Sequence, residues 1–280
     1  MKLKSNKKNR LILFLGGSDG LIFLNFLINK NSDQFKILNV LLFDRNDNII
    51  KLCKRRKLNY HLINNIKTIS LDFEQLKDSI LVSCGFQKKI PDYIINDFNK
   101  KAINIHAAIL PKYRGIHGGI WAQINKEKHL GSTCHYLNEK IDGGNILHIS
   151  KFKNDIKYSR DELTKKLHKS NYDAFLKGFK LLLEGDSGIS QSNNFKNWPK
   201  RSPEDSFFTP SSMDVNSFIH FHRALNRIGI YPFFIEEGKK IIILDFTLKN
   251  DNYKKVKLKD GDIYLKKIKI LKIENKKIQA

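Results

Sequence analysis

The chain alternates between short apolar runs and segments whose apolar residues recur at helical spacing. Nearly continuous apolar runs are typical of buried strands in a parallel sheet, because helices cover both of its faces. Such runs occupy residues 11–15, 37–43 and 79–84. Helical segments follow them at residues 21–28, 49–57 and 92–98. This order predicts an α/β fold built on a mostly parallel, Rossmann-like sheet.

The same reading continues to residue 183. Further strands are expected at residues 60–63, 102–106, 132–137 and 145–149, and further helices at residues 73–77, 120–125 and 159–183. In the last of these helices the apolar residues lie near one stripe, as in a helix that packs against a sheet. We therefore expect a catalytic or binding domain over residues 1–200.

A polar stretch with several prolines, residues 190–212, separates this region from the rest of the chain. A helix is expected at residues 215–227. Four short alternating segments follow, at residues 230–235, 240–246, 253–258 and 262–270. Glycine-containing turns at residues 236–238 and 259–261 connect the first segment to the second and the third to the fourth, as in β-hairpins. Residues 201–280 are thus predicted to form a small β-rich C-terminal domain.

Composition narrows the class of protein. The formal charge of the 280 residues is +23, which favours a phosphate-bearing ligand, but the lysines are scattered along the chain and do not form one nucleic-acid-binding face. Three cysteines without CxxC spacing predict neither disulfides nor a zinc site, and no metal is expected. The basic N-terminus lacks a signal-peptide pattern, and no apolar run is long enough to span a membrane. We expect a cytoplasmic protein that does not contact the membrane.

Candidate chemistry gathers between residues 102 and 147. Asn104 and His106 lie two residues apart in a predicted strand, so their side chains share a face if Ile103 and Ile105 are buried. Such a pair is often only a satisfied polar group at a strand end. Asp142 lies in a glycine-rich loop farther along the chain and supplies a carboxylate for acid–base chemistry.

The surrounding motifs indicate a family. Asn104-x-His106 leads into Leu110-Pro-x-Tyr-Arg-Gly115, and Gly-x-Thr-x-His and Ile-Asp-x-Gly-x-Ile follow by residue 146. This order resembles the folate-dependent formyltransferases, which include glycinamide ribonucleotide transformylase, methionyl-tRNA formyltransferase and sugar-nucleotide N-formyltransferases. The resemblance implies the formyltransferase fold, and a cis peptide bond before Pro111.

The resemblance also implies roles for individual residues. Asn104, His106 and Asp142 would be catalytic, with Asn104 and His106 facing the formyl oxygen and Asp142 orienting His106. The co-substrate would be 10-formyltetrahydrofolate. Its pterin would contact a set formed by Phe86, Gln87, Lys88, Ile90, Leu137 and Ile141. The acceptor would contact a set formed by Gly17, Ser18, Tyr113, Arg114 and His117.

The acceptor class rests on chain architecture. The tRNA enzyme carries a long basic insertion after its second strand, whereas this chain has only a short turn and a helix between residues 44 and 57. The purine enzyme ends before a C-terminal domain of this kind. A nucleoside-diphosphate amino sugar is therefore the expected substrate, with the tRNA and purine enzymes as alternatives. Nucleic acid is expected only in the tRNA alternative, or if the fold serves as an RNA-binding protein. Relatives with a β-rich tail pair through it, which implies a homodimer.

Overall fold

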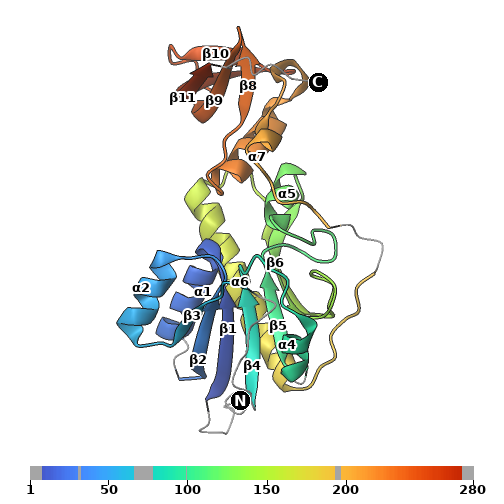
Figure 1. The fold of residues 1–280 in the computed structure, drawn as a ribbon. Helices are drawn as coiled ribbons and strands as arrows, with labels where there is room; N and C mark the ends of the chain where they lie inside the picture. Colours follow the sequence, from blue (N-terminus) through green and yellow to red (C-terminus); the bar gives the residue numbers. More distant parts are fainter. Residues whose placement is uncertain (1–7, 31–32, 66–77, 99, 193–196, 273–280) are drawn as a thin grey trace, which may run out of the picture. The chain divides into compact units, whose positions relative to one another are not determined.

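A computed structural model describes residues 8–30, 33–65, 78–98, 100–192 and 197–272 (Figure 1). The helix predicted at residues 73–77 lies outside these residues. The chain forms two compact units. The first comprises residues 1–119, 129–153 and 161–199, and the second comprises residues 120–128, 154–160 and 200–280. Two segments from before residue 200 thus belong to the second unit. A domain boundary at residue 200 stays a prediction.

The first unit is built on a seven-stranded sheet with the order β3-β2-β1-β4-β5-β6-β7. Its strands are β1 (Asn9–Leu15), β2 (Phe35–Leu42), β3 (Tyr60–Leu62), β4 (Ser79–Cys84), β5 (Ala102–His106), β6 (His129–Tyr136) and β7 (Ile146–Lys153). The pairs from β3 to β5 are parallel, whereas β6 pairs antiparallel with both β5 and β7. The predicted Rossmann-like, mostly parallel sheet is confirmed.

Helices cover both faces of this sheet, which explains why its strands are apolar throughout. The helices of this region are α1 (Gly17–Lys30), α2 (Asp47–Arg56), α4 (Asp92–Asp97) and α6 (Arg160–Leu183) (Figure 1). Residues of α1, α2 and α6 share one core with Leu11 and Leu13 of β1. Residues of α4 pack on the other face with Ile12 and Phe14. The alternation along β1 therefore serves two cores at once.

The turns after β1 and β4 touch at the carboxyl ends of these two strands. A Cβ atom on Gly16 would lie 2.5 Å from the carbonyl oxygen of Gly85, and one on Gly85 would lie 2.4 Å from that of Gly16. Only glycine fits at either position. The helix α1 begins at Gly17, four residues earlier than the apolar pattern suggested, because periodicity marks a buried face and not a first turn. Gly17 and Ser18 consequently occupy the first turn of α1.

Close packing fixes α6 against β6. Gly178 of α6 faces Cys134 of β6 so closely that a Cβ atom would lie 2.4 Å from the Cys134 sulfur. Nearby, the buried Ser132 hydroxyl lies 2.7 Å from the Ser170 hydroxyl and donates to Asn171 Oδ1 at 2.5 Å. Because β6 pairs directly with β5, this contact holds the strand that faces the Asn104 and His106 pair.

The second unit contains α5 residues 120–124, the helix α7 (Val215–Asn226) and a separate antiparallel sheet with the order β10-β11-β9-β8. The helix α5 spans Gly118–Ile124, and two 3-10 turns precede α7, at Glu204–Ser206 and Pro210–Ser212. The strands are β8 (Phe233–Glu236), β9 (Lys239–Thr247), β10 (Lys254–Lys257) and β11 (Asp262–Lys272). Phe218 and Leu225 of α7 pack with Ile243 and Ile263 of this sheet. The predicted β-rich C-terminal region is confirmed.

Among the residues that the structure describes, no helix combines the length and apolar character needed to cross a bilayer. The three cysteines, Cys53, Cys84 and Cys134, are free and buried.

Replacing Gly178 by alanine tests the contact between α6 and β6. Alanine improves helix propensity by about 0.8–1 kcal/mol, but its Cβ would overlap the Cys134 side chain, and overpacking a core costs about 1–3 kcal/mol. We expect a net loss of unfolding free energy in urea titrations. The exposed neighbour Lys177→Ala should change it by less than about 0.5 kcal/mol. If Gly178→Ala has the wild-type unfolding free energy, then α6 and β6 can move apart without a loss of stability.

Candidate active site

The strand β5 presents Asn104 and His106 on the same face of the sheet. Ile103 and Ile105 between and beside them are fully buried in the core that contains α1 and α6. The two polar side chains therefore project to the opposite face, as a strand with two-residue alternation requires. Both side chains remain partly exposed.

The antiparallel partner β6 adds a second histidine. In the register of β5 and β6, Asn104 lies opposite His135, and His106 lies opposite Thr133. The Asn104 amide nitrogen is 3.1 Å from His135 Nε2. His135 Nδ1 lies 2.8 Å from the backbone oxygen of Tyr136. The ring of His135 is therefore fixed at both nitrogens, and its side chain is 1% exposed.

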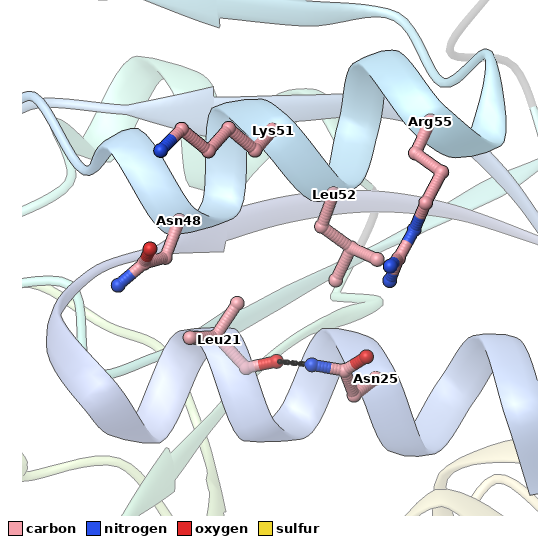
Figure 2. Close-up of a pocket in the computed structure, with 6 residues that line it drawn as sticks. All are labelled: Leu21, Asn25, Asn48, Lys51, Leu52 and Arg55. Atoms are coloured by element: carbon pink, nitrogen blue, oxygen red, sulfur yellow. Dashed lines mark hydrogen bonds between the residues drawn. The ribbon is translucent and has the colours of Figure 1, made fainter.

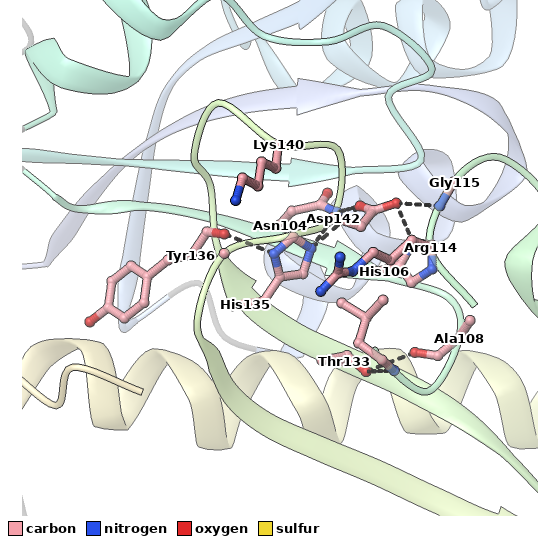
Figure 3. Close-up of polar contacts among 12 residues, drawn as sticks. Asn104, His106, Ala108, Arg114, Gly115, Thr133, His135, Tyr136, Lys140 and Asp142 are labelled. Carbon is pink, nitrogen blue, oxygen red and sulfur yellow. Dashed lines mark hydrogen bonds and ion pairs between the residues drawn. The ribbon is translucent and has the colours of Figure 1, made fainter. Parts of the chain in front are cut away.

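Asp142 reaches the same place from the loop between β6 and β7 (Figure 3). Its Oδ2 accepts a hydrogen bond from the Gly115 N–H at 2.8 Å and lies 3.5 Å from His106 Nδ1. Its Oδ1 accepts from the Asn104 amide at 3.3 Å and lies 3.5 Å from His135 Nε2. The fold thus brings Asn104, His106 and Asp142 together, with His135 beside them.

The surroundings of His106 suit a doubly protonated ring. Its Nε2 lies 2.6 Å from the backbone oxygen of Tyr113, and its Nδ1 faces the Asp142 carboxylate at 3.5 Å. A carbonyl and a carboxylate can only accept, so a proton on each nitrogen satisfies both contacts. His135 Nδ1 likewise faces a backbone carbonyl, and its Nε2 lies 3.1 Å from the Asn104 amide nitrogen and 3.5 Å from Asp142 Oδ1.

The charge of Asp142 is stabilised in the folded protein. Burial alone would raise the pKa of its carboxyl group, but the nearby rings of His106 and His135 and the Gly115 N–H together hold this pKa well below its ordinary value of 3.8. Asp142 is therefore a carboxylate across the whole neutral range. An ionised carboxylate can orient an imidazolium and accept a proton from an incoming nucleophile.

Thr133 connects β6 to the loop that follows β5. Its hydroxyl donates to the backbone oxygen of Ala108 at 2.7 Å and accepts from the N–H of Leu110 at 3.1 Å. The peptide bond between Leu110 and Pro111 is cis, as the resemblance implied. This loop continues to Tyr113, whose backbone oxygen contacts His106 Nε2.

Two residues predicted to contact the acceptor are buried. Tyr113 is 2% exposed and stacks on Trp198 with ring centroids 5.5 Å apart. Arg114 is 6% exposed, and its guanidinium donates to Gln191 Oε1 at 2.9 and 3.2 Å and to the Ser192 carbonyl at 2.9 Å. His117 is partly exposed in the loop before α5, with a left-handed φ of 65°. The roles of these residues in acceptor binding stay predictions.

The residues predicted to contact the pterin fall into two groups. Phe86, Ile90 and Leu137 belong to one hydrophobic cluster on the α4 side of the sheet. Phe86 packs edge-on against Phe14, with ring centroids 5.2 Å apart. The other residues are exposed, including Ile141 at 49%, beside Asp142. They are Gln87, Lys88 and Ile141. Apolar side chains thus lie on both segments predicted to bind the pterin.

A separate surface pocket of about 290 Å³ lies between α1 and α2 (Figure 2). It contains none of the predicted site residues, and its lining includes Lys51 and Arg55 but no carboxylate. The lining residues are Leu21, Asn25, Asn48, Lys51, Leu52 and Arg55. Its charge favours an anion.

Sequence reasoning overlooked two residues that contact Asp142. His135 is the last residue of the Gly-x-Thr-x-His motif, and β-strand alignment of that motif against Asn104 would have found it. Gln191 donates to the backbone oxygens of Asp142 and Gly144 at 3.0 and 2.6 Å. It lies in a polar segment that the sequence analysis interpreted only as a linker, and no motif or periodicity indicated a role for it.

These observations define a protein with a formyltransferase-type fold and a cluster of amide, imidazole and carboxylate groups at the end of β5. The sequence profile of the formyl transferase family matches residues 38–178, which is half of the chain. The chain therefore belongs to the formyl transferase family. This confirms the family predicted from the Asn104-x-His106 motif.

Individual relatives differ in their substrates. The chain is 28% identical over 258 residues to the bifunctional polymyxin resistance protein ArnA of Wigglesworthia glossinidia brevipalpis, covering 88% of this chain and 39% of ArnA. It is 26% identical over 205 residues to methionyl-tRNA formyltransferase of Mycoplasmopsis pulmonis, covering 70% and 68% of the two chains. The structure resembles WlaRD, a sugar 3N-formyltransferase crystallised with dTDP and 5-N-formyl-THF. Here the TM-score is 0.65 and the identity 20%, over 95% of this chain and 98% of WlaRD.

Asp142→Asn tests the stabilisation of the carboxylate. The variant removes the charge that the two imidazoles and the Gly115 N–H favour, so we expect the unfolding free energy at pH 7 to fall by about 1–3 kcal/mol. Because the folded-state pKa lies below the unfolded-state value, the wild type keeps this contribution above about pH 4 and loses it as the pH falls towards the folded-state pKa.

Urea titrations at pH 7, 5 and 3 measure this difference. It should stay constant between the first two values and narrow at the third. The exposed Asp44→Asn serves as the control and should change stability by less than about 0.5 kcal/mol at each pH. If Asp142→Asn is less stable than the wild type by the same amount at all three pH values, the assignment of a lowered pKa to Asp142 is wrong.

Proposed function

We propose that this protein transfers a formyl group from 10-formyltetrahydrofolate to the primary amine of a nucleotide-linked amino sugar. The observation that carries the proposal is the convergence of Asn104 and His106 on Asp142, whose carboxylate oxygens lie 3.3 Å from the Asn104 amide nitrogen and 3.5 Å from His106 Nδ1. Family membership supports the class of reaction. Attack of the amine nitrogen forms a bond to the formyl carbon, and cleavage of the bond between that carbon and N10 releases tetrahydrofolate.

Asn104, His106 and Asp142 have different roles in this transfer. The formyl oxygen gains negative charge when the amine attacks, and hydrogen-bond donors aimed at it lower the barrier. We infer that an amide N–H of Asn104 and the Nδ1–H of His106, which face the Asp142 carboxylate in the structure, turn to the formyl oxygen as Asp142 takes up a proton. Asp142 orients His106 and takes the amine's proton directly or through water. That proton is then delivered to N10 of the leaving tetrahydrofolate.

The residues of the two segments predicted to bind the pterin suit a folate. A pterin offers a flat apolar surface with a hydrogen-bonding edge, which needs apolar side chains and free backbone groups. Phe86 and Leu137 are partly buried in the α4-side cluster, and Ile141 is exposed on the loop that carries Asp142. We infer that these side chains flank the pterin, and that the backbone of residues 85–90 contacts its edge.

Chain architecture supports the amino-sugar acceptor. The likeness to WlaRD extends over nearly the full length of both chains, including the β-rich C-terminal region. The strand β2 ends at Leu42 and α2 begins at Asp47, so there is no long insertion after the second strand. The proposal also includes a homodimeric state.

Methionyl-tRNA is the second candidate acceptor. The relative from Mycoplasmopsis pulmonis carries that activity in its name and covers 70% of this chain. The pocket between α1 and α2, with Lys51 and Arg55 in its lining, has the charge to contact a phosphate backbone.

Substitutions at the site test the catalytic assignment. We expect His106→Ala and Asp142→Asn each to lower kcat/KM at least about 100-fold, the scale of removing a positioned acid, base or oxyanion donor. The exposed His61→Ala, on β3, should retain the wild-type rate. Near-normal rates in both site variants would contradict the assignment.

A panel of amines tests the acceptor class. The protein is mixed with 10-formyltetrahydrofolate and either nucleoside-diphosphate amino sugars, glycinamide ribonucleotide or methionyl-tRNA, and release of tetrahydrofolate is followed. Turnover with an amino sugar but not with the tRNA supports the proposal, and the reverse result selects the tRNA alternative. Absence of turnover with all of them, together with salt-sensitive RNA binding, would favour an RNA-binding protein.

A further inference from the structure

One segment of the first unit contacts both loops that form the site. We call it the strap and define it as the described residues 186–192 and 197–199. Ile189 pairs with Ile146 at the start of β7 through two backbone hydrogen bonds of 2.8 Å. Trp198 donates its backbone N–H to the Arg114 oxygen at 2.8 Å and its indole N–H to the Lys112 oxygen at 3.0 Å. The strap thus binds the loop before Gly115 and the end of the loop that carries Asp142.

Gln191 joins these two loops through a single side chain. Its Oε1 accepts two hydrogen bonds from the guanidinium of Arg114, at 2.9 and 3.2 Å. Its Nε2 donates to the backbone oxygens of Asp142 and Gly144, at 3.0 and 2.6 Å. The carboxamide oxygen therefore accepts two hydrogen bonds, and the carboxamide nitrogen donates two.

Asp142 has a backbone conformation that needs outside support. Its φ is +48°, in the left-handed region that residues other than glycine seldom occupy. Such conformations persist where surrounding contacts fix them, and they cluster at functional sites. Gly144 is also confined, because a Cβ atom there would lie 1.9 Å from the Tyr136 oxygen. The Gln191 amide captures the carbonyl groups of both residues.

The hydrogen bonds close into a ring around the carboxylate. Asp142 Oδ2 accepts from the Gly115 N–H, Gly115 follows Arg114 in the chain, Arg114 donates to Gln191, and Gln191 donates back to the Asp142 oxygen (Figure 3 shows Arg114, Gly115 and Asp142). Both ends of Asp142, its carboxylate and its backbone carbonyl, are fixed in this ring. A substitution of Gln191 is therefore expected to change the position of the Asp142 carboxylate, although the Gln191 side chain does not contact that carboxylate.

We propose that Gln191 is a positioning residue that holds Asp142 in its left-handed conformation and so aims the carboxylate at His106. In this arrangement Arg114 serves the ring, and its buried guanidinium is not a ligand for the acceptor's phosphate. The catalytic consequence rests on the proposed function, but the positioning itself does not.

Amide exchange of Gly115 measures positioning in the absence of any substrate. Gln191→Met preserves the side chain's approximate size and removes both hydrogen-bonding arms. We expect the Gly115 N–H to exchange at least about tenfold faster once the carboxylate that accepts from it is loosened. Leu13 in the core of β1 reports overall stability, and its amide should exchange as in the wild type. The exposed strap variant Ser190→Ala is the matched control and should leave both amides unchanged.

Gln191→Glu separates the two arms of the side chain. At neutral pH the glutamate keeps an acceptor for Arg114 but faces the Asp142 and Gly144 oxygens with a carboxylate, which cannot donate. If Gln191 positions Asp142, this variant should lose protection at Gly115 as Gln191→Met does. A wild-type exchange rate of the Gly115 amide in either variant would overturn the proposal. Gln191 would then have no part in positioning Asp142.

Kinetics and carboxyl titration complete the test. We expect Gln191→Met to lower kcat about 10- to 100-fold with little change in KM, as misplacement of a catalytic group does. The pKa of Asp142, followed by carbon NMR, should rise towards its ordinary value. Loss of Gly115 protection in a protein that transfers no formyl group would uphold the positioning role and reject the proposed function. Unchanged protection of Gly115 in an active enzyme would uphold the proposed function and reject the positioning role.

Discussion

The site depends on one buried carboxylate whose charge the fold has to stabilise. Asp142 faces two imidazoles, an asparagine amide and the Gly115 N–H, and these contacts outweigh the cost of removing it from water. An ionised group in such surroundings acts strongly on its neighbours, because little solvent screens it. Both nitrogens of His106 face acceptors in this arrangement, namely the Asp142 carboxylate and the Tyr113 carbonyl oxygen.

Much of the first unit serves to bring that carboxylate to β5. The switch from parallel to antiparallel pairing at β6 places His135 opposite Asn104. The packing of α6 on β6 through Gly178 fixes the same strand from behind. The strap then holds the Asp142 loop from outside. Sheet, helix and strap therefore act on one small group of side chains.

The pattern of apolar and polar residues predicted the strands well, because strands buried on both faces must be apolar throughout. The start of α1 at Gly17 was missed, since a helix's first turn carries no buried stripe. The motif order identified the family, and two-residue alternation placed Asn104 and His106 on one face. These inferences needed only local chemistry and spacing along the chain.

The sequence by itself determined the fold class and the family, and it predicted three site residues that the structure brings together. Only the tertiary structure decided which other groups meet them. Arg114 lies in the loop after β5, and only the folded chain shows that its guanidinium is buried against Gln191. Gln191 itself read as part of a linker. Contacts between residues so far apart in the chain arise from strand register and loop packing, and neither leaves a periodic trace in the sequence.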